Sequence, residues 1–265
     1  MSLLRLVKRA LATQPWAVLA AAVRGKSHER TGQPCQDAVA WRHTRQGLLL
    51  GAVADGAGSA RLSEVGSELA ARHALDHLET ALADPATWQD AAQARTRLRA
   101  AFETARAALT AEAQQRQARP ADLATTLLVC VAGADRLWAA QVGDGAVVFA
   151  GADGAWRALT RPAAGEYLNE TVFLTSDAAL ERLQIETWAG PVRELAVFSD
   201  GLQMLALKMP EAAPHAPFFQ PLFAWFRQVP DPEAARAELE AWLRSPRVTD
   251  RAEDDLTLLL ARRRD

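Results

Sequence analysis

Four apolar runs of this chain each have an aspartate at one end. Asp37 precedes AVAW, Asp55 follows LLLGAVA, Asp200 follows ELAVFS, and Asp254 with Asp255 precedes LTLLL. Such short apolar runs are typical of buried strands. Two carboxylates about 5 Å apart repel each other by roughly 3 kcal/mol at an effective dielectric near 20. Carboxylates gathered at strand ends therefore need a cation, and the pattern indicates a carboxylate metal centre with hydrolytic chemistry.

The composition is that of a globular protein without the electrostatic signature of nucleic-acid binding. The 265 residues are 49% hydrophobic and 23% charged, which is enough for a sizeable core. Thirty basic and 32 acidic residues give a net charge of -2, so there is no basic footprint for nucleic acid. The two cysteines, Cys35 and Cys130, imply no disulfide framework and fit a reducing compartment.

The N-terminal sequence MSLLRLVKRALATQPWAVLAAAV loosely imitates a signal peptide. Gln14-Pro15 interrupts its apolar run, however, and WAVLAAAV is typical of a strand. No run approaches the 18 or more apolar residues of a membrane span. We therefore expect a cytoplasmic protein that is a single domain over 1–265, with residues 1–15 as an N-terminal extension.

Strand and helix patterns come in blocks along the first half of the chain. Strands are predicted over 16–23, 38–42 and 47–54. Helices are predicted over 63–82 and 88–117, where apolar residues recur at three- and four-residue spacing, and Asp84-Pro85 separates the two.

Sequence patterns typical of strands begin again at residue 123. LATTLLVCVA, LWAAQVG, GAVVFAG and AWRALT are predicted to form a meander, and 161–190 is left unassigned. RELAVFS is predicted to be a strand, GLQMLAL a short helix, 210–221 a packed Pro-rich connector, 233–244 a helix and LTLLLAR the closing strand. Short turns favour antiparallel sheets, and the long helices must cover a sheet face, so we expect stacked sheets with helices outside.

Each acidic motif also has a purely structural interpretation. Asp55-Gly56 and Asp200-Gly201 could be hairpin turns, and Asp144-Gly145 in QVGDGAVVF more so, because strands flank it tightly. Five such aspartates at strand boundaries nevertheless favour one shared centre. Oxygen ligands suit Mg²⁺ or Mn²⁺, and a water that bridges two such ions is a nucleophile for phosphoester hydrolysis.

Other nucleophiles are disfavoured. Cys130 and Arg136 have the Cys-x5-Arg spacing of tyrosine phosphatases, but a strand rather than a helix is predicted after the Arg. Five His and two Cys are scattered, so a zinc site is not expected. His28 in GKSHERTG could approach the centre or could be a structural histidine.

The motif order QD, ADGAGS, ATTL, VGDG, FSDG and DDLTL resembles the metal-dependent protein serine/threonine phosphatases of type 2C, in particular their compact bacterial branch. GKSHERTGQPCQD, AGEYLNETVF and SDGLQMLAL have the character of that branch, and the resemblance covers about 16–262. It implies a four-layer αββα sandwich of two mostly antiparallel sheets flanked by helices, with a two-metal centre between the sheets.

The resemblance also implies roles for single residues. Asp55 would bridge both metals, and the Gly56 carbonyl would bind one of them. Asp37 would hold this centre directly or through water, and Asp200 and Asp254 would complete the shell of the other ion.

Two further positions follow from it. Asp255 stands where the family usually has Asn, which makes Asp254 the better ligand candidate, and Asp144 could help to hold a third, weaker ion. Segment 161–177, around Glu166 and Tyr167, falls where the family has a variable flap.

The sequence departs from the best-known members at two positions. Gly32 replaces their phosphate-binding Arg, with Arg30 and Arg24 nearby but out of register, and Ala57 replaces a His that many bacterial members also lack. The candidate catalytic side chains are therefore Asp55, Asp37, His28 and Arg30.

The resemblance implies hydrolysis of phosphoserine and phosphothreonine in proteins, with Mn²⁺ or Mg²⁺ and with targets of a serine/threonine kinase as substrates. The altered arginine register leaves one alternative, a pseudophosphatase that binds phosphoproteins without turnover. A two-metal phosphoesterase acting on nucleotides or nucleic acid is the other, although the neutral charge disfavours it.

Overall fold

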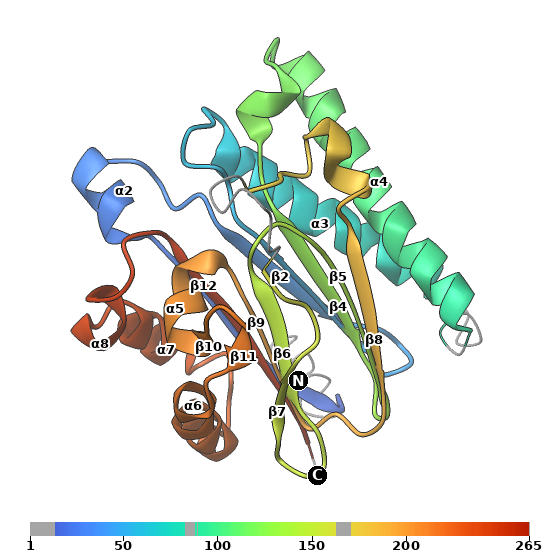
Figure 1. Cartoon of the computed structure of the whole chain (residues 1–265), viewed down its shortest axis with the longest axis vertical. Helices are drawn as coiled ribbons and strands as arrows, with labels where there is room; N and C mark the ends of the chain where they lie inside the picture. Colours follow the sequence, from blue (N-terminus) through green and yellow to red (C-terminus); the bar gives the residue numbers. More distant parts are fainter. Residues whose placement is uncertain (1–13, 83–87, 89, 163–170, 265) are drawn as a thin grey trace, which may run out of the picture.

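The chain folds into two antiparallel sheets that pack face to face (Figure 1). The structure is a computed structural model and describes residues 14–82, 88, 90–162 and 171–264. The first sheet has the order β1 (Trp16–Val23), β12 (Leu256–Arg263), β9 (Glu194–Phe198), β6 (Ala146–Ala150) and β7 (Trp156–Ala158). The second has the order β2 (Ala38–His43), β3 (Leu49–Ala54), β4 (Leu127–Ala132), β5 (Arg136–Val142) and β8 (Gln184–Ala189).

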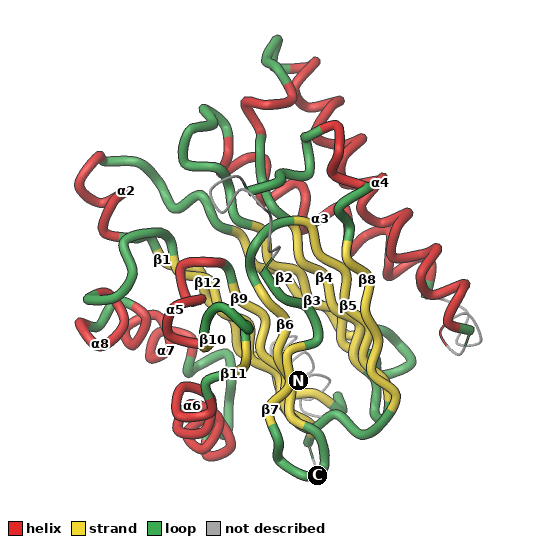
Figure 2. The backbone as a smooth tube through the Cα atoms, viewed as in Figure 1, coloured by secondary structure: helices red, strands yellow, loops and turns green. Residues whose placement is uncertain are grey.

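Helices cover the outer face of each sheet (Figure 2). The second sheet is covered by the long helices α3 (Ser63–Ala81) and α4 (Ala91–Gln115). The first is covered by α5 (Gln203–Ala206), α6 (Ala216–Gln228), α7 (Arg236–Leu243) and α8 (Pro246–Thr249), with a small hairpin of β10 (Leu207–Lys208) and β11 (Ala213–Pro214). The short helix α2 (Lys26–Thr31) follows β1. The predicted αββα sandwich is confirmed.

The central strands are buried on both faces, which explains why their sequences are continuous apolar runs rather than alternating ones. Every residue of β3, β4 and β6 is buried. One apolar cluster lies between the two sheets, with Trp16, Leu49 and Leu259 among its members. A second cluster, around Phe102 on α4, lies between the second sheet and its helices. A third, around Phe219 on α6, lies between the first sheet and its helices.

The strand register brings the acidic motifs to one end of the sandwich. In the second sheet Ala38 pairs with Ala54, so Asp37 and Asp55 are both one residue beyond that pair. In the first sheet Phe198 at the end of β9 pairs with both Leu258 and Ala146, near the starts of β12 and β6. Antiparallel pairing therefore places strand ends and strand starts of both sheets at the same edge.

The predicted meander is wrong at one point. Strands β4 and β5 pair in the second sheet, whereas β6 and β7 pair in the first. The chain thus crosses from one sheet to the other at Asp144, and Asp144-Gly145 is not a hairpin turn. Sequence patterns report that two strands are close in the chain, but not that each finds its partner elsewhere.

The prediction of a Pro-rich connector over 210–221 is also wrong in part, because α6 begins at Ala216, inside that range. Pro217 lies in the first helical turn, where a missing N–H costs no helical hydrogen bond. Phe219, Leu222 and Phe223 are buried at helical spacing and stabilise the element against the first sheet. The prolines of this segment favoured a connector over a helix in the prediction, although its apolar residues have helical spacing.

The remaining elements lie close to the predicted ones, and β8 falls in the stretch that had no assignment. The predicted break at Asp84-Pro85 and most of the N-terminal extension lie outside the described residues. Among the residues that the structure describes, no helix is long and apolar enough to cross a membrane.

Phe102 tests the core beneath α4. The side chain is fully buried, so Phe102→Ala should lower the free energy of unfolding by about 3–5 kcal/mol through lost burial and a residual cavity. Urea unfolding of the two proteins measures this. The adjacent exposed residue provides the control, because Glu103→Ala should change stability by less than about 0.5 kcal/mol. Equal losses from both variants would contradict the packing described here.

Candidate metal centre

Three aspartates from distant parts of the chain meet at the shared end of the sandwich. Asp55, Asp144 and Asp200 each offer a carboxylate oxygen, and these atoms lie within 4.8 Å of one another. Asp55 follows β3 in one sheet, Asp200 follows β9 in the other, and Asp144 lies on the crossing between the sheets. All three are partly exposed, so an ion and a substrate can reach them from solvent.

The main chain of Asp55 is held by the two threonines of the ATTL motif. Thr126 Oγ1 accepts a hydrogen bond from the Asp55 N–H at 3.0 Å, and the Thr126 N–H donates to the Asp55 carbonyl at 2.8 Å. Thr125 Oγ1 donates to the same carbonyl at 2.9 Å. These bonds fix the direction in which the Asp55 side chain leaves the end of β3.

The glycine after each of two aspartates is required by close backbone packing. A Cβ on Gly56 would lie 2.6 Å from the Gln36 carbonyl oxygen, and one on Gly201 would lie 2.1 Å from the Asp255 carbonyl oxygen. Neither glycine has a positive φ, so absence of a side chain rather than turn geometry selects glycine here. The Asp-Gly steps are thus places where neighbouring segments touch.

Asp144 is held by side chains that follow it in the sequence. Thr171 Oγ1 donates to Asp144 Oδ2 at 2.7 Å, and Gln203 Nε2 donates to the Asp144 carbonyl at 3.2 Å. The second bond ties the start of α5, just after Asp200, to the crossing. Sequence reasoning did not single out these partners.

Asp37 lies next to the cluster and is joined to the opposite sheet. Ser199 Oγ donates to Asp37 Oδ2 at 2.7 Å, and Ser199 also accepts from the Thr257 N–H at 3.2 Å. The serine of the FSDG motif therefore links the second sheet at Asp37 with β9 and β12. Sequence reasoning gave Ser199 no role, although its place before Asp200 is the signal that could have found it.

The electrostatics of the centre are those of crowded, poorly solvated carboxylates. Burial, followed by the charge of Asp144, raises the pKa of Asp200 to about 6, and burial raises the pKa of Asp37 to about 8. The pKa of Asp55 is raised well above its usual value by burial and then by the charges of Asp37 and Asp200. A bound cation would reverse these shifts by stabilising the ionised forms.

These residues fit a hard divalent cation. Among the described residues, Asp200 Oδ1 is one of the buried polar atoms with no hydrogen-bond partner. An orphaned carboxylate oxygen beside two further carboxylates is a donor set of the kind that Mg²⁺ and Mn²⁺ prefer.

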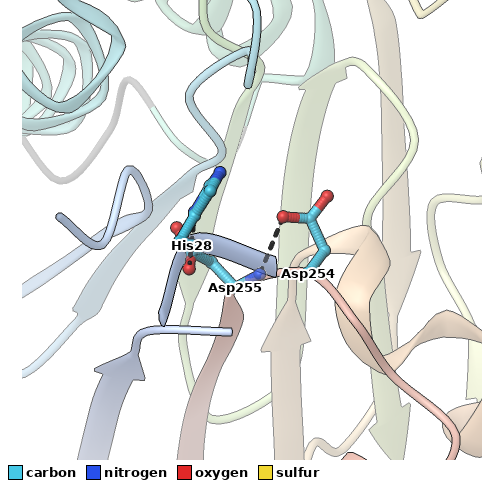
Figure 3. Close-up of side chains that lie close together, drawn as sticks. All are labelled: His28, Asp254 and Asp255. Atoms are coloured by element: carbon cyan, nitrogen blue, oxygen red, sulfur yellow. Dashed lines mark hydrogen bonds and ion pairs between the residues drawn. The ribbon is translucent and has the colours of Figure 1, made fainter. Parts of the chain in front are cut away.

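A second cluster contains His28, Asp254 and Asp255 (Figure 3). Its arrangement differs from the first, because the Asp255 carboxylate is buried and already engaged: its two oxygens accept from the Gly25 N–H at 2.7 Å and from the Gln36 N–H at 2.6 Å. Asp254 is exposed, and its Oδ1 accepts from the Asp255 N–H at 2.8 Å. Asp254 therefore has an accessible carboxylate, whereas Asp255 does not.

The candidate phosphate-binding arginines lie on the surface around α2. Arg30 Nη2 is 2.6 Å from Glu253 Oε2, and Arg24 Nη1 donates to the Gln33 carbonyl at 3.2 Å. The structure does not place either guanidinium against the carboxylate cluster. Glu166 and Tyr167 of the predicted flap lie outside the described residues.

The tyrosine-phosphatase interpretation of Cys130 and Arg136 fails on geometry. Cys130 is fully buried between the sheets on β4, and Arg136 begins β5 across a tight turn. Burial raises the pKa of the Cys130 thiol to about 12, so no thiolate is available there.

The raised carboxyl pKa values predict a pH dependence for the metal-free protein. Asp37 and Asp200 have usual values of 3.8, but their pKa values in the folded protein are about 8 and about 6. Between these values the folded state holds protons that the unfolded state releases. The two carboxyl groups therefore contribute to the free energy of unfolding fully below pH 4, and this contribution is lost as the pH rises toward 8. Each group contributes a slope of at most about 1.4 kcal/mol per pH unit.

Urea unfolding in EDTA between pH 5 and pH 8.5 measures this decline. Asp37→Asn should flatten the pH dependence, and saturating Mn²⁺ should remove it. A metal-free protein that becomes more stable toward pH 8, or a variant with an unchanged slope, would refute the assignment.

Known proteins are similar to this chain in sequence and in fold. A family model described as Protein phosphatase 2C matches residues 24–244. "Serine/threonine-protein phosphatase 3" of Escherichia coli (strain K12) is 35% identical over 252 residues, which cover 93% of this chain and 98% of that relative.

Solved structures of low identity share the fold. The crystal structure of a bacterial serine phosphatase has a TM-score of 0.64 at 17% identity, covering 93% of this chain and 97% of that one. The catalytic domain of the serine threonine protein phosphatase PstP, in complex with 2 manganese ions, has a TM-score of 0.61 at 19% identity, covering 94% and 99%. Because the family model spans most of the chain and the Escherichia coli relative matches it nearly end to end, this chain belongs to the protein phosphatase 2C family and is an enzyme of that phosphatase class.

Proposed function

We propose that this enzyme hydrolyses phosphoserine and phosphothreonine in proteins with the help of two Mn²⁺ or Mg²⁺ ions. The observation that carries the proposal is the convergence of Asp55, Asp144 and Asp200 within 4.8 Å at a solvent-facing end of the sandwich. The names of the relatives support the substrate class, and the manganese in the PstP structure supports the metal.

Six positions would hold the ions. Asp55 would bridge them, the Gly56 carbonyl and Asp37 would serve one, and Asp200 and Asp254 the other. Asp144 would help to hold a third, weaker ion. When bound, two such ions would supply a bridging water as the nucleophile for phosphoester hydrolysis and positive charge beside the phosphoryl oxygens.

The chain's own residues would prepare this site. Thr125 and Thr126 fix the main chain of Asp55, and Ser199 orients the Asp37 carboxylate toward the opposite sheet. These contacts hold the carboxylates together before an ion arrives, which reduces the reorganisation that binding requires.

The partners would be phosphorylated segments of other proteins, made by a serine/threonine kinase, in the cytoplasm. The cluster lies at partly exposed strand ends, which suits a phosphorylated side chain presented on a flexible segment. The net charge of -2 favours neither nucleic acid nor an anionic membrane as a partner. His28 and Arg30 remain candidates for assisting catalysis, and Arg30 would have to leave Glu253 to contact phosphate.

Phosphate release from a phosphoserine peptide tests this function. We expect turnover with Mn²⁺ and none in EDTA, and Asp55→Asn or Asp200→Asn should lower kcat/KM by at least about 100-fold because each removes a ligand. Circular dichroism checks that both variants stay folded. Asp153→Asn is the matched control and should leave turnover unchanged, since Asp153 is exposed in the turn between β6 and β7, at the other end of β6 from Asp144.

Release that persists in EDTA would overturn the metal mechanism. Mn²⁺ binding and phosphopeptide binding without turnover would instead identify a phosphoprotein-binding module. Faster release from nucleotides than from phosphopeptides would overturn the substrate class.

A further inference from the structure

The buried carboxylate of Asp255 joins chain segments that carry or adjoin the proposed metal ligands. We propose that Asp255, with His28 packed against it, is a positioning residue that sets the metal affinity of the centre without binding the metal. This inference rests on the proposed function, because it concerns the same centre.

The side chain of Asp255 connects three segments. Oδ1 accepts from the Gly25 N–H at 2.7 Å, at the junction of β1 and α2, and Oδ2 accepts from the Gln36 N–H at 2.6 Å. His28 Nδ1 lies 3.0 Å from Oδ1. Asp255 is 2% exposed, so water cannot replace these partners. A buried carboxylate that accepts two backbone N–H groups and has an imidazole nitrogen in close contact is a structural junction rather than a free ligand.

The main chain of Asp255 contacts the neighbouring Asp254 and one further segment, at Gly201. Its N–H donates to Asp254 Oδ1 at 2.8 Å and so orients that carboxylate (Figure 3). Its carbonyl oxygen packs so closely on Gly201 that a Cβ there would be 2.1 Å away. Asp255 thus contacts the residue after Asp200 and directs the side chain of Asp254.

Gln36 carries the effect to Asp37 and Asp55. Its N–H is held by Asp255, while its carbonyl accepts from the Gly56 N–H at 3.2 Å and from Ser67 Oγ at 2.6 Å. Asp37 is the next residue along the chain, and Gly56 directly follows Asp55. Release of Gln36 from Asp255 would therefore loosen both of these proposed ligands.

In this chain the surroundings of residue 255 favour a carboxylate over the asparagine that the resembled family usually has there. An asparagine side chain has one acceptor oxygen, and its amide would face one of the N–H groups donor to donor. The His28 ring is buried over Oδ1, and its second nitrogen points away from Asp255 (Figure 3). The aspartate at 255 and the histidine at 28 are therefore a matched pair.

Isothermal titration of the metal-free protein with Mn²⁺ tests the proposal. Asp255→Asn should raise the Mn²⁺ Kd by about 10–100-fold, as for other residues that support metal ligands. His28→Ala should also raise the Kd. His28→Asn should keep the Kd within about threefold of wild type, because asparagine places an amide nitrogen near the position of Nδ1 and so preserves the contact with Asp255.

Thr44→Val is the matched control. Thr44 is also buried, and its Oγ1 accepts a backbone N–H, that of Leu48, at 3.1 Å, but in the turn between β2 and β3 at the opposite end of the sandwich. This variant should lose stability with no change in Mn²⁺ affinity, which separates positioning from general destabilisation.

An unchanged Kd in Asp255→Asn, or in His28→Ala, would overturn the proposal, as would an equal loss of affinity in Thr44→Val. Should Asp255→Asn fold only with metal present, the comparison of His28→Ala with His28→Asn decides the question. A wild-type protein that binds no Mn²⁺ would overturn the proposed function itself, whereas normal binding by wild type and all variants would overturn only the positioning role.

Discussion

The structure depends on one electrostatic constraint, the repulsion among carboxylates that the fold brings to one end of a sandwich. Asp55, Asp144 and Asp200 come from both sheets and from the crossing between them, and burial raises the pKa of Asp200 and of Asp55. Without a cation, the burial and mutual repulsion of these carboxylates would lower the stability of the fold with no compensating interaction. A divalent ion bound at this centre would offset that repulsion and would link the fold to the chemistry.

Polar contacts hold the aspartates against their repulsion. Thr126 and Thr125 fix Asp55, Ser199 holds Asp37, and the buried Asp255 joins the segments around Gln36 and Gly25. Most of these contacts run from one sheet or loop to another. The centre is therefore a property of the whole sandwich end, not of any single loop.

The sequence predicts the strands and the long helices well, because apolar periodicity is a local signal, and the ends of the predicted strands are what identify the aspartates proposed as ligands. It predicts neither the sheet crossing at Asp144 nor helix α6, because the first depends on distant strand partners and the second was hidden by prolines. The roles of Ser199, Thr171 and Asp255 were also missed, since a hydrogen bond across 27 to 230 residues leaves no spacing to detect.

A crystal structure of the protein grown with Mn²⁺, with anomalous scattering recorded for manganese, tests the central claim most directly. The account predicts two strong peaks at about 2.1 Å from carboxylate oxygens, with Asp55 bound to both and Asp200 to one of them. Manganese bound between His28 and Asp255, or no peak at Asp55 and Asp200, would contradict it.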